Sequence, residues 1–186
     1  MPDHTRDELV ALLRDRSFRR GDFRLSSGRR SPYYVDARAT TMSSRGLILV
    51  GKLGLRALRG ARWAPDLVGG LTLGADPVAY AIAAASQQDP PTLDAFTVRK
   101  EPKEHGTGRR IEGPYESGAS VVVVEDVITT GGSALQAIES VRDAGGKVLG
   151  VLAVVDREEG GREALERAGY DTLALVTLGE LIEGER

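Results

Sequence analysis

Four consecutive valines at positions 121–124 restrict the fold of this chain more than any other feature. A strand that is apolar at every position is buried on both faces, as in a parallel sheet. Apolar runs that are typical of strands occur at 33–37, 66–70, 93–98, 120–125, 147–155 and 172–176. Helical periodicity is found at 5–16, 43–58, 77–87, 133–144 and 161–168. From residue 66 onward the two kinds of segment alternate, which predicts an α/β fold with a mostly parallel, twisted sheet flanked by helices.

The length of 186 residues suits one domain with a substantial core, so we expect residues 1–186 to form a single domain. About the first 40 residues lie outside the strand–helix alternation and are expected to form a small added subdomain, with the core at about 43–186. Residues 99–117 show no periodicity and carry glycine, proline and many charges. A loop of that length inside a compact domain usually has a function or is disordered.

The composition excludes several classes of function. The net charge of −2 provides no broad basic surface, so no nucleic-acid partner is expected. The longest strongly apolar run, 148–155, is too short to cross a bilayer, and residues 1–18 lack the pattern of a signal peptide. The chain has no cysteine, which excludes thiolate catalysis and thiolate metal ligands. We therefore expect a cytoplasmic protein with no membrane partner.

The segment that follows the valines has the chemistry of a sugar-phosphate site. Residues 129–133 read Thr-Thr-Gly-Gly-Ser and lead into the helix expected from 133. Glycines let the main chain approach a ligand closely, and a helix N-terminus offers free N–H groups to an anion. Glu125 and Asp126 precede this loop, and carboxylates accept hydrogen bonds from sugar hydroxyls. The arrangement suits a ribose 5-phosphate group.

A purely structural interpretation of the same loop is that it turns the chain and that Ser133 caps the helix. Capping does not explain two adjacent acids at the end of a buried strand. The glycine-rich motifs of P-loop NTPases and of dinucleotide-binding folds are absent from the sequence. The ribose phosphate interpretation is therefore the stronger one.

Residues 121–133 closely resemble the phosphoribosyl diphosphate (PRPP) motif of type I phosphoribosyltransferases: an apolar strand, two acids and T-x-G-x-S/T. The resemblance implies the type I phosphoribosyltransferase fold, with a small N-terminal hood subdomain and a long mobile loop. It also implies Mg²⁺, carried by PRPP and waters with no protein ligand. The implied PRPP-binding residues are Glu125, Asp126, Val127, Ile128, Thr129, Thr130, Gly131, Gly132 and Ser133, with Gly74 and Ala75 in the segment GGLTLGADP.

Two further segments resemble orotate phosphoribosyltransferases. Residues 23–36 read FRLSSGRRSPYYVD, and residues 99–113 read RKEPKEHGTGRRIEG. The resemblance implies transfer of ribose 5-phosphate from PRPP to orotate, giving orotidine 5′-phosphate and diphosphate in pyrimidine (UMP) biosynthesis. It also implies a homodimer in which the mobile loop reaches the neighbouring subunit's site. The implied orotate-binding residues are Ser26, Ser27, Gly28, Tyr33, Tyr34, Thr129 and Arg157.

Chemistry gives the loop at 99–113 a role of its own. When diphosphate leaves PRPP, cations and a proton donor that close over it stabilise its charge and exclude water. Two of the chain's four lysines lie in this loop, although the chain otherwise uses arginine. On composition alone, a solvated charged loop is equally consistent with the sequence. The expected catalytic residues are Arg99, Lys100, Lys103 and His105, with Asp126 from the PRPP motif.

The chain departs from the family pattern at two positions. Many members carry a lysine where this chain has Ser26, and another where it has Gly74. Two alternatives to the orotate enzyme also remain at this stage. One is a phosphoribosyltransferase for another base. The other is a PRPP-sensing regulator that binds DNA, although only about 18 residues precede the FRLSSGRRSPYY segment.

Overall fold

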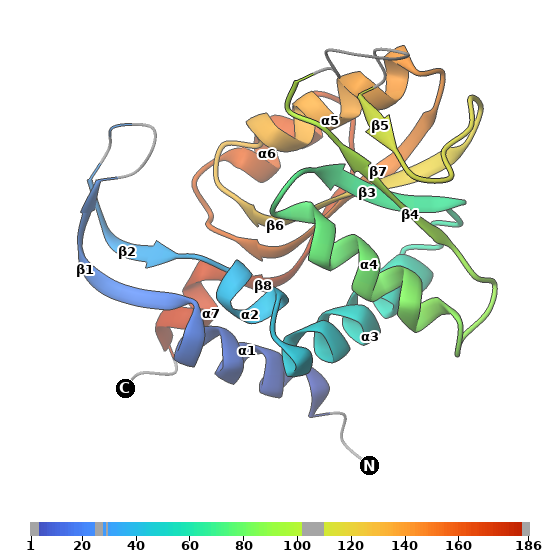
Figure 1. Cartoon of the computed structure of the whole chain (residues 1–186). Coiled ribbons are helices and arrows are strands. Elements are labelled where there is room, and N and C mark those ends of the chain that lie inside the picture. The colour runs from blue at the N-terminus through green and yellow to red at the C-terminus, as the bar shows by residue number, and fades with distance from the viewer. Residues whose placement is uncertain (1–3, 25–27, 29, 102–109, 184–186) are drawn as a thin grey trace.

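The computed structural model describes residues 4–24, 28, 30–101 and 110–183, and its centre is a six-stranded sheet (Figure 1). The strand order is β5-β4-β3-β6-β7-β8. The strands are β3 (Leu67–Leu71), β4 (Asp94–Val98), β5 (Ile111–Glu112), β6 (Ser120–Ile128), β7 (Lys147–Asp156) and β8 (Thr172–Thr177). All neighbours pair in parallel except β5, which runs antiparallel to β4. The predicted α/β fold with a mostly parallel sheet is confirmed.

Helices cover both faces of this sheet, which explains the run of four valines. Val122 and Val124 belong to one buried cluster, and Val121 and Val123 belong to another on the opposite face. In Figure 1 the helices of the first face lie below the sheet and those of the second lie above it. The first face carries α1 (Thr5–Arg16), α3 (Ser44–Gly60), α4 (Ala75–Ser86) and α7 (Leu178–Glu183); the second carries α5 (Gly132–Asp143) and α6 (Gly161–Arg167). No helix in the described parts of the chain is long and apolar enough to span a membrane.

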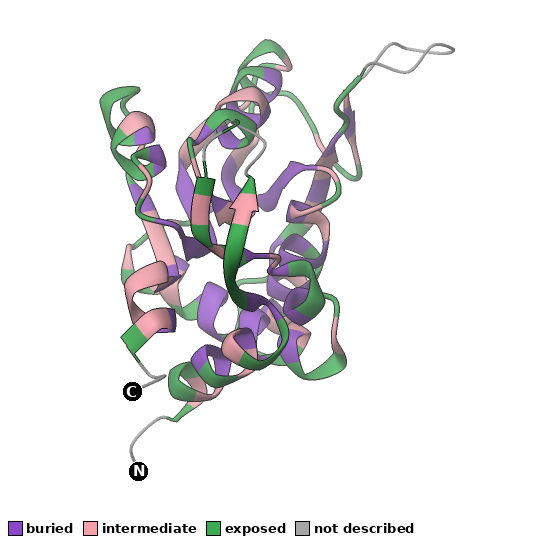
Figure 2. Cartoon of the chain, turned by 90° about the vertical axis from the view of Figure 1, so that its left-hand side faces the viewer, coloured by how far each residue is buried: buried purple, intermediate pink, exposed green. Residues whose placement is uncertain are grey.

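A two-stranded antiparallel hairpin projects from the molecule beside the sheet. It consists of β1 (Phe18–Arg24) and β2 (Arg30–Val35) and is followed by the short helix α2 (Arg38–Thr41). Figure 2 shows the hairpin in front, mostly exposed or half-buried, with buried strands behind it. The sequence did not predict β1, because its exposed residues lack the apolar pattern of a core strand. Helix α1 does not share this exposure, since it buries Leu9 and Leu13 in the core.

Several element boundaries differ from those expected. Strand β6 continues to Ile128 instead of ending at Glu125, so Asp126 also lies within the strand. Pairing with β7 holds those extra residues, since Ile128 is still in register with Asp156. Strand β2 ends at Val35, two residues before the expected end. The segment expected to be irregular at 99–117 contains β5, and α2 and α7 were also not foreseen.

Candidate active site

A polar cavity of about 270 Å³ opens where β3 and β6 end. The carboxyl edge of a parallel sheet is where ligands bind in open α/β folds. Pairing between β3 and β6 stops at Gly69 and Val123, so the last residues of β6 extend beyond the paired part of β3. The cavity is lined by Tyr34, Val35, Asp36, Arg38, Leu71, Thr72, Leu73, Gly74, Lys100, Glu125, Asp126, Val127, Thr129, Ser133 and Arg157.

The loop between β6 and α5 presents main-chain N–H groups at the edge of this cavity. Gly131 adopts φ +81°, a left-handed conformation that glycine adopts without a steric penalty, and it immediately precedes α5. No side chain caps α5, so the first N–H groups of the helix lack a side-chain acceptor. Ser133 lies within the helix and lines the cavity, which contradicts the interpretation that its hydroxyl is the cap. This loop can bind an anion.

Close main-chain packing against the start of α6 holds the same loop in place. A Cβ atom on Gly131 would lie 2.9 Å from the carbonyl oxygen of Gly161. In the other direction, a Cβ atom on Gly161 would lie 2.6 Å from the carbonyl oxygen of Thr129. Both positions therefore need glycine. The sequence analysis missed Gly161, although the Gly-Gly pair before a predicted helix was a visible signal.

The two acids of β6 border the cavity in a largely desolvated environment. Glu125 is buried, and its burial raises the pKa of its carboxyl to about 8, with a further contribution from the charge of Asp126. Burial also raises the pKa of Asp126, although a hydrogen bond from the main-chain N–H of Val127 and the charge of Arg38 oppose this effect. Both carboxyls therefore bind protons more readily than carboxyls in water, until a cation or a hydrogen-bonding ligand enters.

Asp126 also explains why residue 74 is glycine. A Cβ atom on Gly74 would lie 2.4 Å from Oδ1 of Asp126, so no side chain fits there unless the carboxylate moves. Gly74 directly precedes α4, which, like α5, has no side-chain cap. A lysine at this position would therefore require the Asp126 carboxylate to shift from the place it occupies here. Ala75, the next residue, is buried and does not line the cavity.

Arg157 reaches the cavity from the end of β7. Its side chain is only 5% exposed and pairs with Glu159 at 2.7 Å. Its Nη2 also donates to the hydroxyl of Ser31 and the carbonyl oxygen of Tyr33 in the hairpin, both at 3.3 Å. Its Nε is buried and has no hydrogen-bond partner among the described residues. An arginine in this environment is a candidate ligand donor, not a surface ion pair.

The described part of the loop after β4 places one expected catalytic cation at the cavity. Lys100 lines it, and its carbonyl oxygen accepts a hydrogen bond of 2.9 Å from Arg110. Arg99 instead pairs with Glu112 of β5 at 2.8 Å and does not line the cavity. Lys103 and His105 lie outside the described residues.

Of the expected orotate-binding residues in the hairpin, the structure places some at the cavity and others away from it. Tyr34 lines the cavity and is 40% exposed. Tyr33 instead stacks on Phe18, with ring centroids 5.5 Å apart, and packs against the core, as an ordinary core aromatic does. Gly28 lines no part of the cavity, and Ser26 and Ser27 lie outside the described residues.

The remaining residues of the PRPP motif contribute less to the described cavity. Val127 lines it, whereas the side chain of Ile128 is buried in the core. Thr129 lines it, but Thr130, Gly131 and Gly132 do not. Any contact from those three would come through the loop as a whole.

Asp36 and Arg38 line the cavity and were not predicted from the sequence. The carboxylate of Asp36 accepts hydrogen bonds from Nε and Nη2 of Arg38 at 2.8 and 2.9 Å. This pair lowers the pKa of Asp36 and raises that of Arg38. In the sequence, only the D-x-R spacing indicates that these two side chains could pair.

Oxygen ligands for a metal ion are present but dispersed. Three carboxylates, those of Asp36, Glu125 and Asp126, border the cavity. Within the described residues, no group of three or more acidic or histidine side chains is arranged to hold a metal ion. These hard oxygen atoms suit a hydrated Mg²⁺ that brings other ligands with it.

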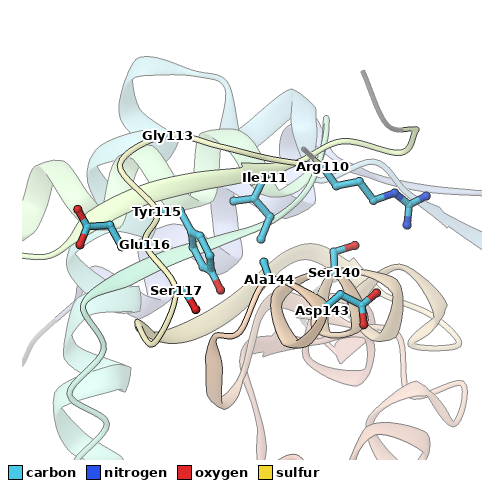
Figure 3. A pocket seen from close by; sticks show the side chains of 9 residues that line it. All are labelled: Arg110, Ile111, Gly113, Tyr115, Glu116, Ser117, Ser140, Asp143 and Ala144. Atoms are coloured by element: carbon cyan, nitrogen blue, oxygen red, sulfur yellow. The ribbon is translucent and has the colours of Figure 1, made fainter. Parts of the chain in front are cut away.

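A larger cavity of about 630 Å³ lies elsewhere, between the segment 110–117 and the end of α5 (Figure 3). Ile111 and Tyr115 face Ala144 across it, and Ser140 and Asp143 border it from α5. These residues are at the C-terminal end of α5, roughly 16 Å along the helix axis from the anion-binding loop. This second cavity is therefore separate from the candidate active site.

Comparison with known proteins identifies the family of this chain. The model of the phosphoribosyl transferase domain matches residues 44–169. An orotate phosphoribosyltransferase from Aquifex aeolicus is 48% identical over 180 residues, covering 95% of this chain and 97% of the relative. The crystal structure of Mycobacterium tuberculosis orotate phosphoribosyltransferase with Fe(III) dicitrate is 47% identical, has a TM-score of 0.85 and covers 96% of this chain and 99% of its own.

A second structure of the M. tuberculosis enzyme, in complex with PRPP, has a TM-score of 0.79 at 40% identity, covering 97% of this chain and 93% of its own. The family model covers more than half of the chain, and the relatives are similar along nearly their whole length. These matches include the loop after β6 and both acids of that strand. The chain therefore belongs to the phosphoribosyltransferase family and, within it, to the orotate phosphoribosyltransferases.

Proposed function

We propose that this protein transfers ribose 5-phosphate from PRPP to orotate, giving orotidine 5′-phosphate and diphosphate in pyrimidine biosynthesis. One observation carries the proposal: a single cavity is bordered by the anion-binding loop, both acids of β6, Lys100 and Arg157. These groups come from separate strands and loops and match the parts of PRPP and of an anionic pyrimidine.

The loop at 129–133 binds the 5-phosphate in this scheme. Its main-chain N–H groups and the hydroxyls of Thr129 and Ser133 donate to phosphate oxygens at the start of α5, where the helix dipole also favours an anion. The ribose then lies toward β6. There Asp126 and Glu125 accept hydrogen bonds from the 2- and 3-hydroxyls of the ribose.

The same acids act on the transition state. As the bond from C1 to diphosphate lengthens, the ribose ring gains positive charge, and a nearby carboxylate stabilises it. Their raised pKa values reflect desolvation, so the ionised form interacts strongly once a positive charge develops beside it. Nitrogen N1 of orotate attacks C1 and gives up its proton to solvent, and diphosphate leaves with the electron pair of the broken C–O bond.

Cations from the loop after β4 stabilise the leaving diphosphate. Lys100 already borders the cavity. Lys103, His105 and Arg99 complete the set when the loop closes, and closure also excludes water from a hydrolysable donor. His105 can protonate the departing oxygen near neutral pH.

Arg157 recognises orotate from the opposite side. Its planar guanidinium suits a carboxylate or a carbonyl of the pyrimidine, and its unpaired Nε gains a partner when the base binds. Tyr34 covers the base, and Thr129 with Ser26, Ser27 and Gly28 contributes polar contacts. Asp36 and Asp126 would hold a hydrated Mg²⁺ brought by PRPP, by accepting hydrogen bonds from its waters, and the ion would neutralise phosphate charge.

The active unit is a homodimer in this proposal. The face formed by α3 and α4 exposes large apolar side chains, with Ile48 50% exposed and Tyr80 53% exposed. Leu47 and Leu55 border the same groove, of about 820 Å³. Two copies that associate through this face would shield it from water and let each mobile loop reach the other site. A cytoplasmic location fits the highly charged substrate, which does not cross membranes unaided.

Assays with PRPP and a panel of bases test the proposal. We expect diphosphate release with orotate and little with uracil, adenine or hypoxanthine. Turnover of another base in preference to orotate would point to a different member of the family. An inert protein that binds nucleic acid in a salt-dependent manner would indicate a regulator.

A further inference from the structure

Three cations border the candidate active site in the described part of the chain, and they occupy different sides of it. Arg157 is held at the hairpin side by Glu159 and by main-chain and hydroxyl oxygens of β2. Lys100 lies at the root of the loop after β4. Arg38 comes from the first turn of α2, and the reaction as proposed above gives it no role.

The side chain of Arg38 is fixed before any ligand binds. The carboxylate of Asp36 accepts from both Nε and Nη2, and its Oδ1 also accepts from the main-chain N–H of Arg38 at 3.1 Å. A fork of this kind defines the plane of the guanidinium. Nη1 is not part of the fork. At 45% exposure the side chain remains accessible to a ligand that enters the cavity.

Arg38 lies near the start of α4. Its charge and that of Asp126 act on each other. Asp126 in turn lies against Gly74, so closely that a Cβ atom there would be 2.4 Å from Oδ1. The loop at 71–74 borders the same cavity, and the first N–H groups of α4 have no side-chain cap. A guanidinium and a helix N-terminus thus border the same cavity as Asp126.

We propose that Arg38 binds the diphosphate oxygens of PRPP together with the main chain of the loop at 71–74, and that Asp36 positions it. The proposal rests on the reaction proposed above, because it needs a diphosphate in this cavity. Residue 74 is glycine and carries no cation, and a side chain there would displace the carboxylate of Asp126. Arg38 supplies a charge to the same cavity from α2.

Binding measurements with substrate fragments test this assignment. The ligands are PRPP, inorganic diphosphate and ribose 5-phosphate, and the variants are Arg38→Ala, Arg38→Gln, Arg38→Lys and Asp36→Asn. Arg45→Ala is the matched control, since Arg45 is a similarly exposed arginine that pairs with Glu8 away from the cavity. Calorimetry gives the dissociation constants, and circular dichroism shows which variants are folded.

We expect Arg38→Ala and Arg38→Gln to weaken PRPP and diphosphate binding about tenfold to a hundredfold, as for the loss of hydrogen bonds between charged groups. Binding of ribose 5-phosphate should stay unchanged, because that fragment has no diphosphate. Lysine at this position should restore part of the affinity. Asp36→Asn should raise the KM for PRPP more than it lowers kcat, and Arg45→Ala should match the wild type.

Equal weakening of ribose 5-phosphate and PRPP binding would overturn the assignment, since Arg38 would then act on the fold of the site. Unchanged diphosphate affinity in a folded Arg38→Gln variant would overturn it as well. The two proposals fail in distinguishable ways. If the wild type does not convert orotate while Arg38→Gln still loses diphosphate affinity, only the proposed reaction is wrong.

Discussion

The loop at 129–133 and the charged groups opposite it use different means to hold a ligand. The loop is one contiguous stretch that offers main-chain N–H groups, and its shape depends on glycine contacts with the start of α6. The opposite side consists of side chains from several elements: Arg38 from α2, Lys100 after β4 and Arg157 after β7. We call the first the main-chain half of the site and the second the side-chain half. Substitutions should therefore affect the two halves through different parameters.

The largest effect is expected in the side-chain half, at Lys103. Lys103→Ala should lower kcat about a hundredfold or more while changing PRPP affinity much less, because its charge acts mainly as diphosphate departs. Steady-state kinetics and PRPP binding measure the two quantities. The control is Lys147→Ala, an exposed lysine at the start of β7 that does not line the cavity. An unchanged kcat in the Lys103 variant would contradict a catalytic role for this loop.

A substitution that disturbs the main-chain half should weaken ligand binding instead. In Gly161→Ala, the new methyl group would press on the carbonyl oxygen of Thr129 and shift the phosphate loop. We expect the affinity for ribose 5-phosphate to fall about tenfold or more, as a misplaced helix N-terminus loses its charge-assisted hydrogen bonds. Gly60→Ala is the control, since a Cβ atom there meets nothing within 4 Å. Equal affinities in the two variants would show that the contact with α6 does not shape the loop.

A smaller effect is expected for Arg157→Lys. Lysine keeps the charge but loses the planar fork, so the KM for orotate should rise about tenfold while that for PRPP changes little. Thermal unfolding should accompany the kinetics, because Arg157 also connects β7 to the hairpin. A rise in the KM for PRPP alone would show that Arg157 does not bind the base.

The smallest effect concerns stability and its dependence on pH. The pKa of Glu125 is about 8 in the folded protein and its ordinary value when unfolded, so the folded state binds the proton more tightly. The stability from this group is complete below its unfolded pKa and is lost as pH rises toward 8. Glu125→Gln should remove this loss. Urea unfolding at pH 5 and pH 8.5 should show the variant gaining stability relative to the wild type at the higher pH only; a constant difference would contradict the raised pKa.

Local patterns in the sequence made the main-chain half predictable. The valine strand, the acids and the Thr-Thr-Gly-Gly-Ser loop are contiguous, so their spacing predicts a phosphate site without any knowledge of distant contacts. The end of β6 was misplaced because pairing with β7 holds Glu125 to Ile128 in the strand, and that pairing depends on a segment about 28 residues away. The exposed strand β1 carried no apolar alternation to reveal it.

The sequence by itself determined the parallel sheet and the phosphate loop, because buried strands and glycine turns are encoded by neighbouring residues. Only the tertiary structure decided which charges meet in the cavity. It brought Arg38 to the cavity that Gly74 also lines, placed Arg157 between the hairpin and β7, and supported the loop with Gly161. Each of these contacts joins residues far apart in the chain, so it depends on packing between elements and leaves no local pattern.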